Sequence, residues 1–388
     1  MMNILSSPRE PSAPHGEVEL IEYVDSEEGF SGFLAIDSGG HALSAGGLRM
    51  QPGLTAERIV GLARAMSFKQ RLLGLSVGGA KCGIDYDPRR PGKREALGRF
   101  LTFLRPHLQE RYSMGPDMGV GWSELESVAR EVGIASVKIA IAGAQGLSEE
   151  EFLSRIRLLD ASVGVGPLGR RRAGHGVGHA ALAVLARQGV EAGEARVGLQ
   201  GFGNLGWGTA HALAEAGVGL TAVADVSGCV VRRQGIDLDT LNGSVPAEAP
   251  PQALFDESLD VLILAAVEDA ITLEQARNLD VKAVVCGANL TMSEAVENLL
   301  HERGIVVVPD FVAGCCGSAS MDALFGPVAR PEPEEVLLRS AKTIADVVRA
   351  ILERSEKESI TPRNAALSMA HHVTPGVRRP YGGLSYES

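Results

Sequence analysis

Hydrophobic residues follow two different periods along the chain. In the first stretch, apolar and polar residues alternate at every second position, as they do in half-buried β-strands. Three strands are predicted there, over 18–24, 30–36 and 41–44. Further on, apolar residues recur every three or four positions. This period predicts amphipathic helices beginning at Thr55 and over 95–108, with a short strand near Ile84 between them.

Beyond residue 160 the pattern changes to short apolar runs separated by charged, helix-like segments. This alternation is typical of a parallel α/β sheet. The apolar runs predict strands over 196–200, 219–224, 261–266, 281–286 and 305–308. Helices are expected over 177–188, up to about Ala216, and over 334–355. The segment 161–178 contains six glycines and three consecutive arginines, and we predict an interdomain hinge there.

Composition narrows the class of protein. A length of 388 residues suggests two domains, or at most three. The net charge of -11 argues against a nucleic-acid partner, because phosphate binding requires a basic face. Glycine accounts for 47 residues, well above its usual share, which favours tight loops against ligands. Residues 1–16 are rich in proline and serine, and we expect a flexible arm.

Cysteine and histidine usage bears on compartment and metals. The five cysteines are irregularly spaced and form no C-x-x-C pair, which argues against a disulfide scaffold and a structural zinc site. Cys315 and Cys316 are expected to be buried, inert thiols. The histidines lack a third ligand at a suitable spacing, so no metal is predicted. The start resembles no secretory signal and no apolar run approaches 18 residues, so we expect a cytoplasmic protein without a membrane span.

The strongest local motif joins the strand 196–200 to the strand that ends before Asp225. It is a G-x-G-x-x-G sequence consisting of Gly201, Phe202, Gly203, Asn204, Leu205 and Gly206. The first glycine allows a tight turn, the second lets the backbone approach a pyrophosphate, and the third lets the following helix pack on the strand. The N–H groups of the helix N-terminus then face the phosphates. Because strand, glycines, helix, strand and acid occur in this order, dinucleotide binding is favoured over a purely structural turn.

Asp225 also bears on the choice of cofactor. Its carboxylate can accept hydrogen bonds from the adenosine ribose, and it would repel the 2′-phosphate of NADP. Arg232 and Arg233 follow shortly after Val226 and are near enough in sequence to reach such a phosphate, although arginines of an exposed turn are more often solvated. The sequence therefore predicts NAD, with Asp225 and Val226 at the ribose.

Two lysines and an aspartate form a second chemical set. Lys69 is expected at the end of the first helix, where a lysine is more often a surface group than a ligand. Lys81 is expected in a glycine-flanked loop, and Asp117 follows in a G-P-D-M-G stretch. An amino-acid substrate requires an ammonium for its α-carboxylate, an amine of lowered pKa as general base, and a carboxylate for its amino group. These three residues supply that set.

These residues belong to a longer, ordered series of motifs. The series reads G-G-x-R-M, M-x-x-K, G-G-A-K, P-D-x-G, G-F-G-N-x-G, A-A-x-E-x-x-I-T, G-A-N and V-P-D. It covers about residues 17–325 and resembles the glutamate/leucine/phenylalanine/valine dehydrogenase family. The resemblance implies an α/β fold with a substrate and oligomerisation domain over 17–160 and a Rossmann-type, doubly wound NAD-binding domain over 161–334. A cleft would separate the domains, and residues 335–388 would return to the first.

The resemblance also implies roles for individual residues. Lys69 would bind the substrate α-carboxylate, Lys81 would be the catalytic lysine that activates water, and Asp117 would exchange protons with the amino group. The substrate would be bound, in addition, by Gly46, Gly47 and Met50. The cofactor would contact, besides the glycine motif, Asp225, Val226, Ala265, Ala266 and Asn289. Relatives pair through the N-terminal strands, so the resemblance implies a homo-oligomer.

Three positions depart from the family pattern. Ala173 replaces a threonine near the nicotinamide amide, and Gly314 replaces an asparagine that contacts substrate and nicotinamide. Losing one such hydrogen bond costs about 1–3 kcal/mol. Ala45 stands where glutamate-specific relatives place a lysine. Because an unpaired buried carboxylate is costly, the sequence predicts an apolar substrate side chain and a chain closer to the leucine, phenylalanine and valine types.

The leading hypothesis is an NAD-dependent dehydrogenase that reversibly deaminates an apolar L-amino acid to its 2-oxo acid and ammonia. An alternative is a divergent enzyme that acts on a specialised amine or imine. A third is a cofactor-binding protein whose catalysis has decayed. The retained lysines argue against the third hypothesis, whereas Ala173 and Gly314 keep it open.

Overall fold

The computed structural model describes residues 17–241, 243–370, 374–376 and 378–383. The predicted flexible arm, residues 1–16, lies outside them. Contacts divide the chain into two compact units. Of the described residues, the first unit holds those up to Ser67 together with Val77–Ala144. The second holds Phe68–Ser76 and the residues from Gln145 onward.

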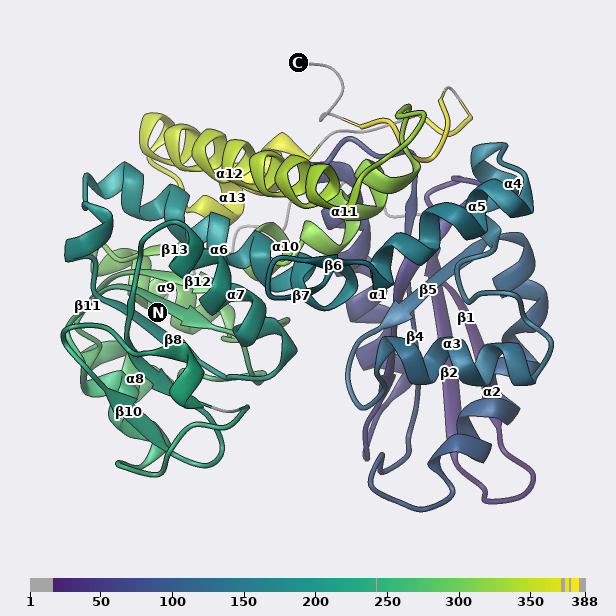
Figure 1. Ribbon diagram of the computed structural model, residues 1–388, viewed down its shortest axis with the longest axis horizontal. Helices are drawn as coiled ribbons and strands as arrows, with labels where there is room; N and C mark the ends of the chain where they lie inside the picture. The colour runs from purple at the N-terminus through teal and green to yellow at the C-terminus, as the bar shows by residue number, and fades with distance from the viewer. Residues whose placement is uncertain (1–16, 242, 371–373, 377, 384–388) are drawn as a thin grey trace, which may run out of the picture. The chain divides into compact units, whose positions relative to one another are not determined.

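A five-stranded mixed sheet forms the centre of the first unit, in the order β1-β2-β4-β3-β5 (Figure 1). The strands are β1 (Glu19–Val24), β2 (Ser31–Asp37), β3 (Ser44–Met50), β4 (Gly78–Ile84) and β5 (Tyr112–Pro116). β2 is antiparallel to β1 and β4, whereas β3 is parallel to β4 and β5. Leu34 and Leu48 of the sheet pack with residues of α2 (Lys93–Glu110) and α3 (Trp122–Glu131) in one core. The other face of β2 packs with the first part of α1 (Ala56–Leu72) through Phe33 and Ile59.

Two expectations for this unit are wrong. The third strand spans Ser44–Met50 and not 41–44. Lys81 lies inside the strand β4 and not in a loop, because this strand begins at Gly78. Every residue of β4 is buried, so the strand shows no alternation of apolar and polar residues, and its glycines resembled a loop. The other predicted strands and helices of this unit are confirmed within a few residues.

The second unit contains a six-stranded sheet in the order β10-β9-β8-β11-β12-β13. Its strands are β8 (Val197–Gln200), β9 (Leu220–Ala224), β10 (Cys229–Val231), β11 (Leu259–Leu264), β12 (Val281–Cys286) and β13 (Val306–Val308). All neighbours are parallel except β10, which is antiparallel to β9. The chain passes from β8 to β9 on one side and later to β11 on the other. The predicted Rossmann-type, doubly wound sheet is confirmed, with its switch point between β8 and β11.

Helices and short elements complete the described chain. The helices after α3 are α4 (Ala140–Gln145), α5 (Glu149–Ile156), α6 (Leu168–Gln188), α7 (Asn204–Glu215), α8 (Leu273–Asn278), α9 (Glu294–Glu302), α10 (Asp310–Ala313), α11 (Cys316–Phe325), α12 (Pro333–Glu358) and α13 (Pro362–Met369). A small ribbon is formed by β6 (Ser162–Val163) and β7 (Gly166–Pro167). Across the described segments, no helix has the length and apolar character needed to cross a membrane.

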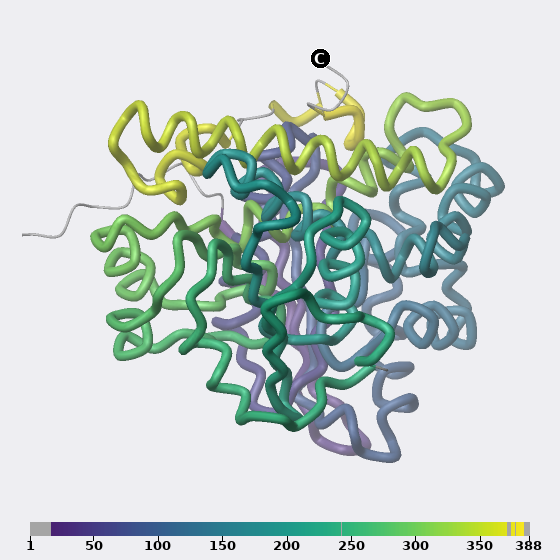
Figure 2. Tube along the Cα trace, turned by 60° about the vertical axis from the view of Figure 1, so that its left-hand side comes forward, coloured from purple at the N-terminus to yellow at the C-terminus, as the bar shows by residue number. Residues whose placement is uncertain are grey.

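The long helix α12, drawn in yellow-green, packs on α6 and α11 (Figure 2). These contacts place α12 in the second compact unit, together with α13. The division into units therefore differs from the predicted domains, in which residues 335–388 return to the first domain and the boundary lies near residue 160. The sequence showed an amphipathic helix here but did not show which partner its apolar face would meet.

The predicted hinge at 161–178 is largely helical. The helix α6 begins at Leu168 and contains Gly174, Gly176 and Gly178. A Cβ on Gly174 would overlap the backbone of α7, and one on Gly176 would overlap the side chain of Cys316. The glycines therefore serve close packing between helices, a use that composition does not distinguish from a flexible linker.

Candidate active site

The candidate catalytic cluster lies on one face of β3, β4 and β5. Side chains alternate between the two faces of a strand, so Gly47 and Arg49 share a face of β3. Gly47 pairs with Gly115 of β5, and Asp117 follows two residues later. A Cβ on Gly47 would stand 2.9 Å from the Cβ of Asp117 and 3.4 Å from the Nζ of Lys81. Glycine at this position therefore leaves the space in which the two charged side chains meet.

Asp117 contacts two cations through one oxygen. Its Oδ2 lies 2.8 Å from the Nε of Arg49 and 3.0 Å from the Nζ of Lys81. Burial alone would raise the pKa of Asp117, but the charges of Lys81 and Arg49 and their hydrogen bonds outweigh this effect and lower it to about 2. Asp117 is therefore a carboxylate at neutral pH. In turn, it stabilises the ammonium form of Lys81.

Two residues predicted to bind substrate do not share this face. Met50 is buried in the core of the first unit with Leu48, on the side of β3 opposite Arg49. A Cβ on Gly46 would overlap the carbonyl oxygen of Ala80, so Gly46 lets β3 and β4 approach closely. Of the three predicted residues, Gly47 is the one at the charged cluster. Strict strand alternation through G-G-x-R-M separates these positions into two sets.

Lys69 lies in the last turn of α1, within the segment Phe68–Ser76 of the second unit. Its buried Nζ donates to the Oδ1 of Asn289 at 3.0 Å and to the carbonyl oxygen of Gly314 at 3.3 Å. Three positions that the sequence singled out therefore meet. A Cβ on Gly314 would stand 3.2 Å from the Nζ of Lys69, so a larger residue here would press on the ammonium group.

The turn between β8 and α7 has the geometry of a dinucleotide-binding turn. Gly201 has a φ of +93°, and a Cβ there would stand 2.6 Å from the Cβ of Ala266. A Cβ on Gly206 would overlap the carbonyl oxygen of Gly201. By contrast, a Cβ on Gly203 would meet nothing within 4 Å. The first and last glycines are therefore required by packing, whereas the middle one faces open space at the N-terminus of α7, where a pyrophosphate fits.

The other predicted cofactor residues of this unit lie at the carboxyl ends of neighbouring strands. Ala265 and Ala266 follow β11, and the amide of Ala265 donates to the carbonyl oxygen of Gln200 at the end of β8. Asn289 follows β12 by three residues. Phe202 is buried beside the turn, whereas Asn204 is exposed and Leu205 is half-buried. In open α/β sheets, ligands bind at this edge.

Asp225 follows β9 and is held by two backbone amides. Its Oδ1 accepts from the amide of Ser227 at 2.7 Å, and its Oδ2 accepts from the amide of Val245 at 3.0 Å. These bonds fix the carboxylate, and each oxygen keeps a lone pair for a ribose hydroxyl. The neighbouring Val226 is exposed. Arg232 donates to the Oε1 of Glu248 at 2.6 Å, so its charge is already balanced.

Sequence reasoning missed two buried cations of the first unit. Arg49 lies inside the G-G-x-R-M motif, but its partner Asp117 is 68 residues away, and spacing alone does not join them. Lys138 lies between α3 and α4, and its Nζ is 3.5 Å from the point where a Cβ on Gly115 would stand. The sequence contained one signal for this residue, because Lys138 is the one charged residue in the apolar stretch 134–142.

The described cysteines and histidines suggest no further chemistry at this site. Burial raises the pKa of both Cys315 and Cys316 to about 12, so both are thiols at neutral pH. His175 and His179 lie against each other on α6, with ring centroids 4.6 Å apart. Within the described residues, no group of three or more His, Cys, Asp or Glu side chains is placed to hold a metal ion.

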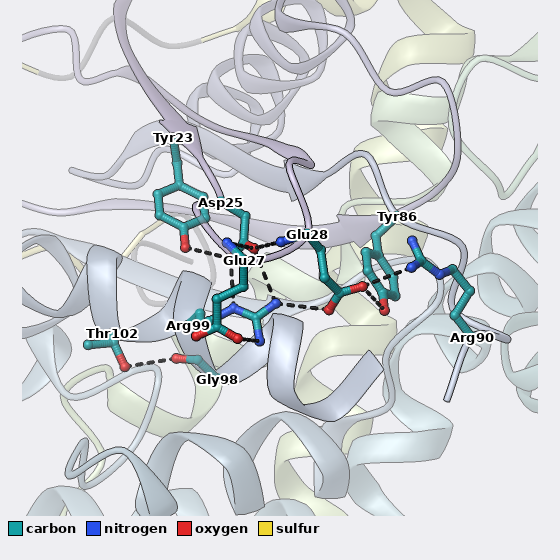
Figure 3. A network of polar contacts seen from close by, with 9 residues as sticks. All are labelled: Tyr23, Asp25, Glu27, Glu28, Tyr86, Arg90, Gly98, Arg99 and Thr102. Carbon is teal, nitrogen blue, oxygen red and sulfur yellow. Dashed lines mark hydrogen bonds and ion pairs between the residues drawn. The ribbon is translucent and has the colours of Figure 1, made fainter. Parts of the chain in front are cut away.

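A second polar network lies at the turn between β1 and β2 (Figure 3). Arg99 of α2 lies with its Nε 2.7 Å from the Oδ2 of Asp25, and it also pairs with Glu27 and Glu28. Asp25 accepts from the hydroxyl of Tyr23 at 2.9 Å, and from the backbone amides of Glu27 and Glu28. Charged and polar groups of the chain itself therefore surround this carboxylate.

An open groove of about 540 Å³ borders this network. Two of its lining residues are the cations Arg94 and Arg99. Arg94 pairs with Glu131 and donates to Ser127, while Arg99 is held by Asp25. The guanidinium groups of the groove are thus already balanced by carboxylates.

Comparison with known families identifies the chain. The family described as Glutamate/Leucine/Phenylalanine/Valine dehydrogenase matches residues 166–373, and the Glu/Leu/Phe/Val dehydrogenase dimerisation domain matches residues 17–133. The chain belongs to this dehydrogenase family. The two-domain fold of the family, with a dimerisation domain followed by a nucleotide-binding domain, agrees with the architecture that the sequence predicted.

Relatives of this chain in the Glu/Leu/Phe/Val dehydrogenase family differ in the cofactor that their names state. The NADP-specific glutamate dehydrogenase of Saccharolobus shibatae is 30% identical over 287 residues, which are 70% of this chain and 65% of the relative. The NAD-specific glutamate dehydrogenase A of Halobacterium salinarum is 29% identical over 335 residues, 81% of this chain and 73% of the relative. The chain thus spans slightly less than two thirds of the Saccharolobus enzyme.

The solved structures that resemble this chain include a hetero-hexameric glutamate dehydrogenase from Thermus thermophilus in a Leu-bound form. It is 26% identical to this chain and has a TM-score of 0.75. The match covers 91% of this chain and 87% of the Thermus chain. The similarity therefore extends over both described units.

Proposed function

We propose that this chain catalyses the reversible, nicotinamide-dependent oxidative deamination of an L-amino acid to the 2-oxo acid and ammonia. The observation that carries the proposal is the buried contact of 3.0 Å between Lys81 and Asp117, with Arg49 on the same carboxylate oxygen. A lysine and a carboxylate in contact can pass protons between water and an amino group. Membership of the dehydrogenase family and the dinucleotide turn support the same reaction.

In this proposal each charged residue has a separate task. A nicotinamide dinucleotide bound at the turn 201–206 would accept the hydride of the substrate α-carbon. Asp117 would accept a hydrogen bond from the substrate ammonium group, which would compete with Lys81 for the carboxylate. Losing part of this ion pair favours the neutral amine of Lys81, which can then take a proton from the water that attacks the imine. Lys69 would hold the α-carboxylate through its Nζ.

NADH formation across a panel of the twenty amino acids tests the proposal. Turnover of at least one amino acid, abolished in Lys81→Ala, would support it. No turnover across the panel, with dinucleotide binding intact, would favour the alternative of a cofactor-binding protein with decayed catalysis. Ala173 and Gly314 are the two positions that keep this alternative open. A divergent enzyme would instead oxidise an amine outside the panel.

The finer proposal for the cofactor is NAD. Asp225 is held at the end of β9 with lone pairs left for a ribose, and Glu248 already balances the charge of Arg232. Both features disfavour a 2′-phosphate. Relatives of both cofactor types are known, so calorimetric titration with NAD and NADP decides the question. Tighter binding of NADP would overturn this assignment, and Asp225→Ser should narrow the difference.

Domains and assembly belong to the same proposal. We assign substrate binding and oligomerisation to residues 17–160 and NAD binding to residues 161–334. The helix α12 packs on α6 and α11 of the second unit, so residues 335–388 are not assigned to the first domain. The match of residues 17–133 to a dimerisation domain supports a homo-oligomer built through the N-terminal strands. Light scattering at micromolar concentration tests this assignment, and a monomer would contradict it.

For the substrate we propose an L-amino acid with an apolar side chain. The prediction of an apolar side chain follows from Ala45, which shares a face of β3 with Gly47. Ala45 gives β3 a methyl group at this position and no cation that could pair with a side-chain carboxylate, and burying an unpaired carboxylate is costly.

A further inference from the structure

The turn that follows β12 contains a residue with an unfavourable backbone conformation. Leu290 has a φ of +55°, in the left-handed region that residues other than glycine, asparagine and aspartate rarely adopt. Its side chain is 38% exposed, so burial of the leucine does not force this conformation. Strained backbone of this kind persists where neighbouring groups hold it, and it is found most often at functional sites.

Leu290 is held on both sides by hydrogen bonds. Its amide donates to the Oδ2 of Asp310 at 2.9 Å, and its carbonyl oxygen accepts from the amide of Asp269 at 2.9 Å. Asp310 follows β13, the strand that pairs with β12, and its side chain is 10% exposed. The Nη2 of Arg363 lies 3.9 Å from its other oxygen. A hydrogen bond to a carboxylate is about twice as strong as one between neutral groups, which suits Asp310 to offset the strain.

Asp310 stands behind both acceptors of the Lys69 ammonium group. Leu290 directly follows Asn289, whose Oδ1 accepts from the Nζ of Lys69. A rotation about the N–Cα bond of Leu290 would turn the peptide that joins the two residues, and would move Asn289. The backbone carbonyl oxygen of Asp310 also accepts from the amide of Gly314 at 2.8 Å, and the carbonyl oxygen of Gly314 is the second acceptor of Lys69.

The place of Asn289 in the sheet indicates which end of a dinucleotide it would meet. Asp225, the candidate ligand of the adenosine ribose, follows β9, and the turn 201–206 follows β8. Asn289 follows β12, three strands from β9 and on the other side of the switch point between β8 and β11. A dinucleotide with its pyrophosphate at the turn would therefore extend its nicotinamide half toward Asn289.

We propose that Asp310 is a positioning residue for the nicotinamide half of the dinucleotide. Its carboxylate holds Leu290 in the left-handed conformation and thereby keeps Asn289 directed at the ligand. This inference rests on the proposed function, because it takes a nicotinamide dinucleotide as the ligand of this unit. Asp310 would act without touching the dinucleotide.

Calorimetric titration with NAD and with ADP separates positioning from a general loss of structure, because ADP lacks the nicotinamide half. Asp310→Ala should raise the Kd for NAD about 10-fold, the effect of losing one well-placed hydrogen bond, and should leave the Kd for ADP within about twofold. Asp310→Asn keeps an oxygen that can accept from the amide of Leu290, so its Kd for NAD should stay within about threefold of the wild type. An equal loss for NAD and ADP in Asp310→Ala, or no loss for either, would overturn the proposal.

A second substitution tests the backbone conformation itself. Glycine adopts a positive φ readily, whereas alanine does not. In the Asp310→Ala background, Leu290→Gly should therefore return the Kd for NAD to within about threefold of the wild type. Leu290→Ala in the same background is the matched control, because it removes the same side chain and keeps the strain, and it should give no recovery. Equal recovery from both would assign the effect to the leucine side chain and refute the proposal.

Two further arms keep the outcome clear. Should Asp310→Ala not fold, Asp310→Ser takes its place, because serine keeps a polar group at the start of α10 but ends one atom earlier than aspartate. Binding requires no turnover, so absence of deamination with NAD binding intact would contradict the proposed function alone. A wild type that binds neither NAD nor NADP would contradict both proposals.

Discussion

The first unit contains two clusters of charged side chains that differ in how their charges are balanced. At the turn between β1 and β2 there are three carboxylates and two cations: Arg99 binds Asp25, Glu27 and Glu28, and Arg90 also binds Glu28. At the strand face, Arg49 and Lys81 share a single oxygen of Asp117. The first cluster fills the acceptor capacity of its buried carboxylate with groups of its own chain. The second concentrates positive charge over glycines.

This difference separates a structural network from a chemical one. Asp25 has lost all exposure, and backbone amides, a tyrosine and an arginine surround it, so a ligand would have to displace part of the fold. The side chain of Asp117 keeps 17% of its surface exposed, beside the small residues Gly47 and Gly115 of the same strand face. Both carboxyl groups have a pKa lowered to about 2. A lowered pKa is thus common to both clusters, and only the surroundings distinguish them.

The largest expected difference between the clusters is in catalysis. Lys81→Ala should lower kcat by about 10²- to 10⁴-fold, the usual contribution of a general base, while NAD affinity is unchanged. Steady-state kinetics and calorimetric titration measure the two quantities. Arg99→Met is the matched control and should keep kcat within a few-fold. Near wild-type turnover in Lys81→Ala would mean that this lysine only completes an ion pair.

The opposite result is expected for stability. Arg99→Met should lower the free energy of unfolding by about 2–4 kcal/mol, because it leaves the carboxylate of Asp25 buried and without its cation. Arg99 is itself 22% exposed, which keeps the effect below that of a fully buried pair. Urea unfolding at neutral pH measures the change. If Arg99→Met lost more activity than folded protein, the cluster around Arg99 would have a role in catalysis, which would contradict its assignment as a structural network.

Lys69 extends the comparison to the second unit. Lys69→Ala should raise KM about 10- to 100-fold and change kcat less, because the residue is proposed to hold the α-carboxylate and not to move protons. Initial rates over a wide range of substrate concentrations give both constants. A fall in kcat with KM unchanged would instead assign Lys69 to the chemical step. Lys342→Ala, which removes an exposed helix lysine paired with Asp346, is the control.

Lowering the pH from 6 toward 2 should reduce the contribution of the Asp117 ion pairs to the free energy of unfolding. Because the pKa of Asp117 is lowered to about 2 from an ordinary 3.8, its charged form stabilises the fold above pH 4, and this stabilisation is lost as the pH falls toward 2. The difference in unfolding free energy between wild type and Asp117→Asn should shrink by about 1 kcal/mol between pH 6 and pH 3. A constant difference across this range would contradict the ion pairs as the cause.

The smallest effect is expected at the exposed edge of the Arg99 network. Glu27 is 66% exposed and pairs with Arg99 at 3.1 Å. Such surface pairs contribute about 0–1 kcal/mol, so Glu27→Gln should be nearly neutral in urea unfolding. A loss as large as that of Arg99→Met would show that the three carboxylates act as one unit.

The parts of the fold that follow from local periodicity could be predicted from the sequence. The parallel strands of the second unit and the turn 201–206 are examples, because their signals lie within 30 consecutive residues. Only the end of β4 was predicted, as a short strand near Ile84, because its first part is rich in glycine and buried on both faces and therefore shows no alternation. Similarly, the glycines of α6 resembled a linker because their contacts are made with α7 and α11, which lie later in the chain.

The candidate site shows the same limit. Lys69, Lys81 and Asp117 were singled out because they stand in ordered motifs. Arg49 and Lys138 were missed, since their importance depends on strands that pair across long stretches of sequence. Parallel pairing of β3 and β5 joins Gly47 to Gly115, and no local pattern encodes that register.

The close fit of α6 against α7 has a consequence for how cofactor affinity can change. Gly174 lies against the backbone at Leu205 and Thr209, and the hydroxyl of Thr209 donates to the carbonyl oxygen of Gly174. α7 starts at Asn204, so this contact fixes its first two turns from behind. A methyl group at position 174 would shift the amides that face the pyrophosphate. Laboratory selection for tighter or weaker dinucleotide binding should therefore yield substitutions on α6, in residues that never meet the dinucleotide.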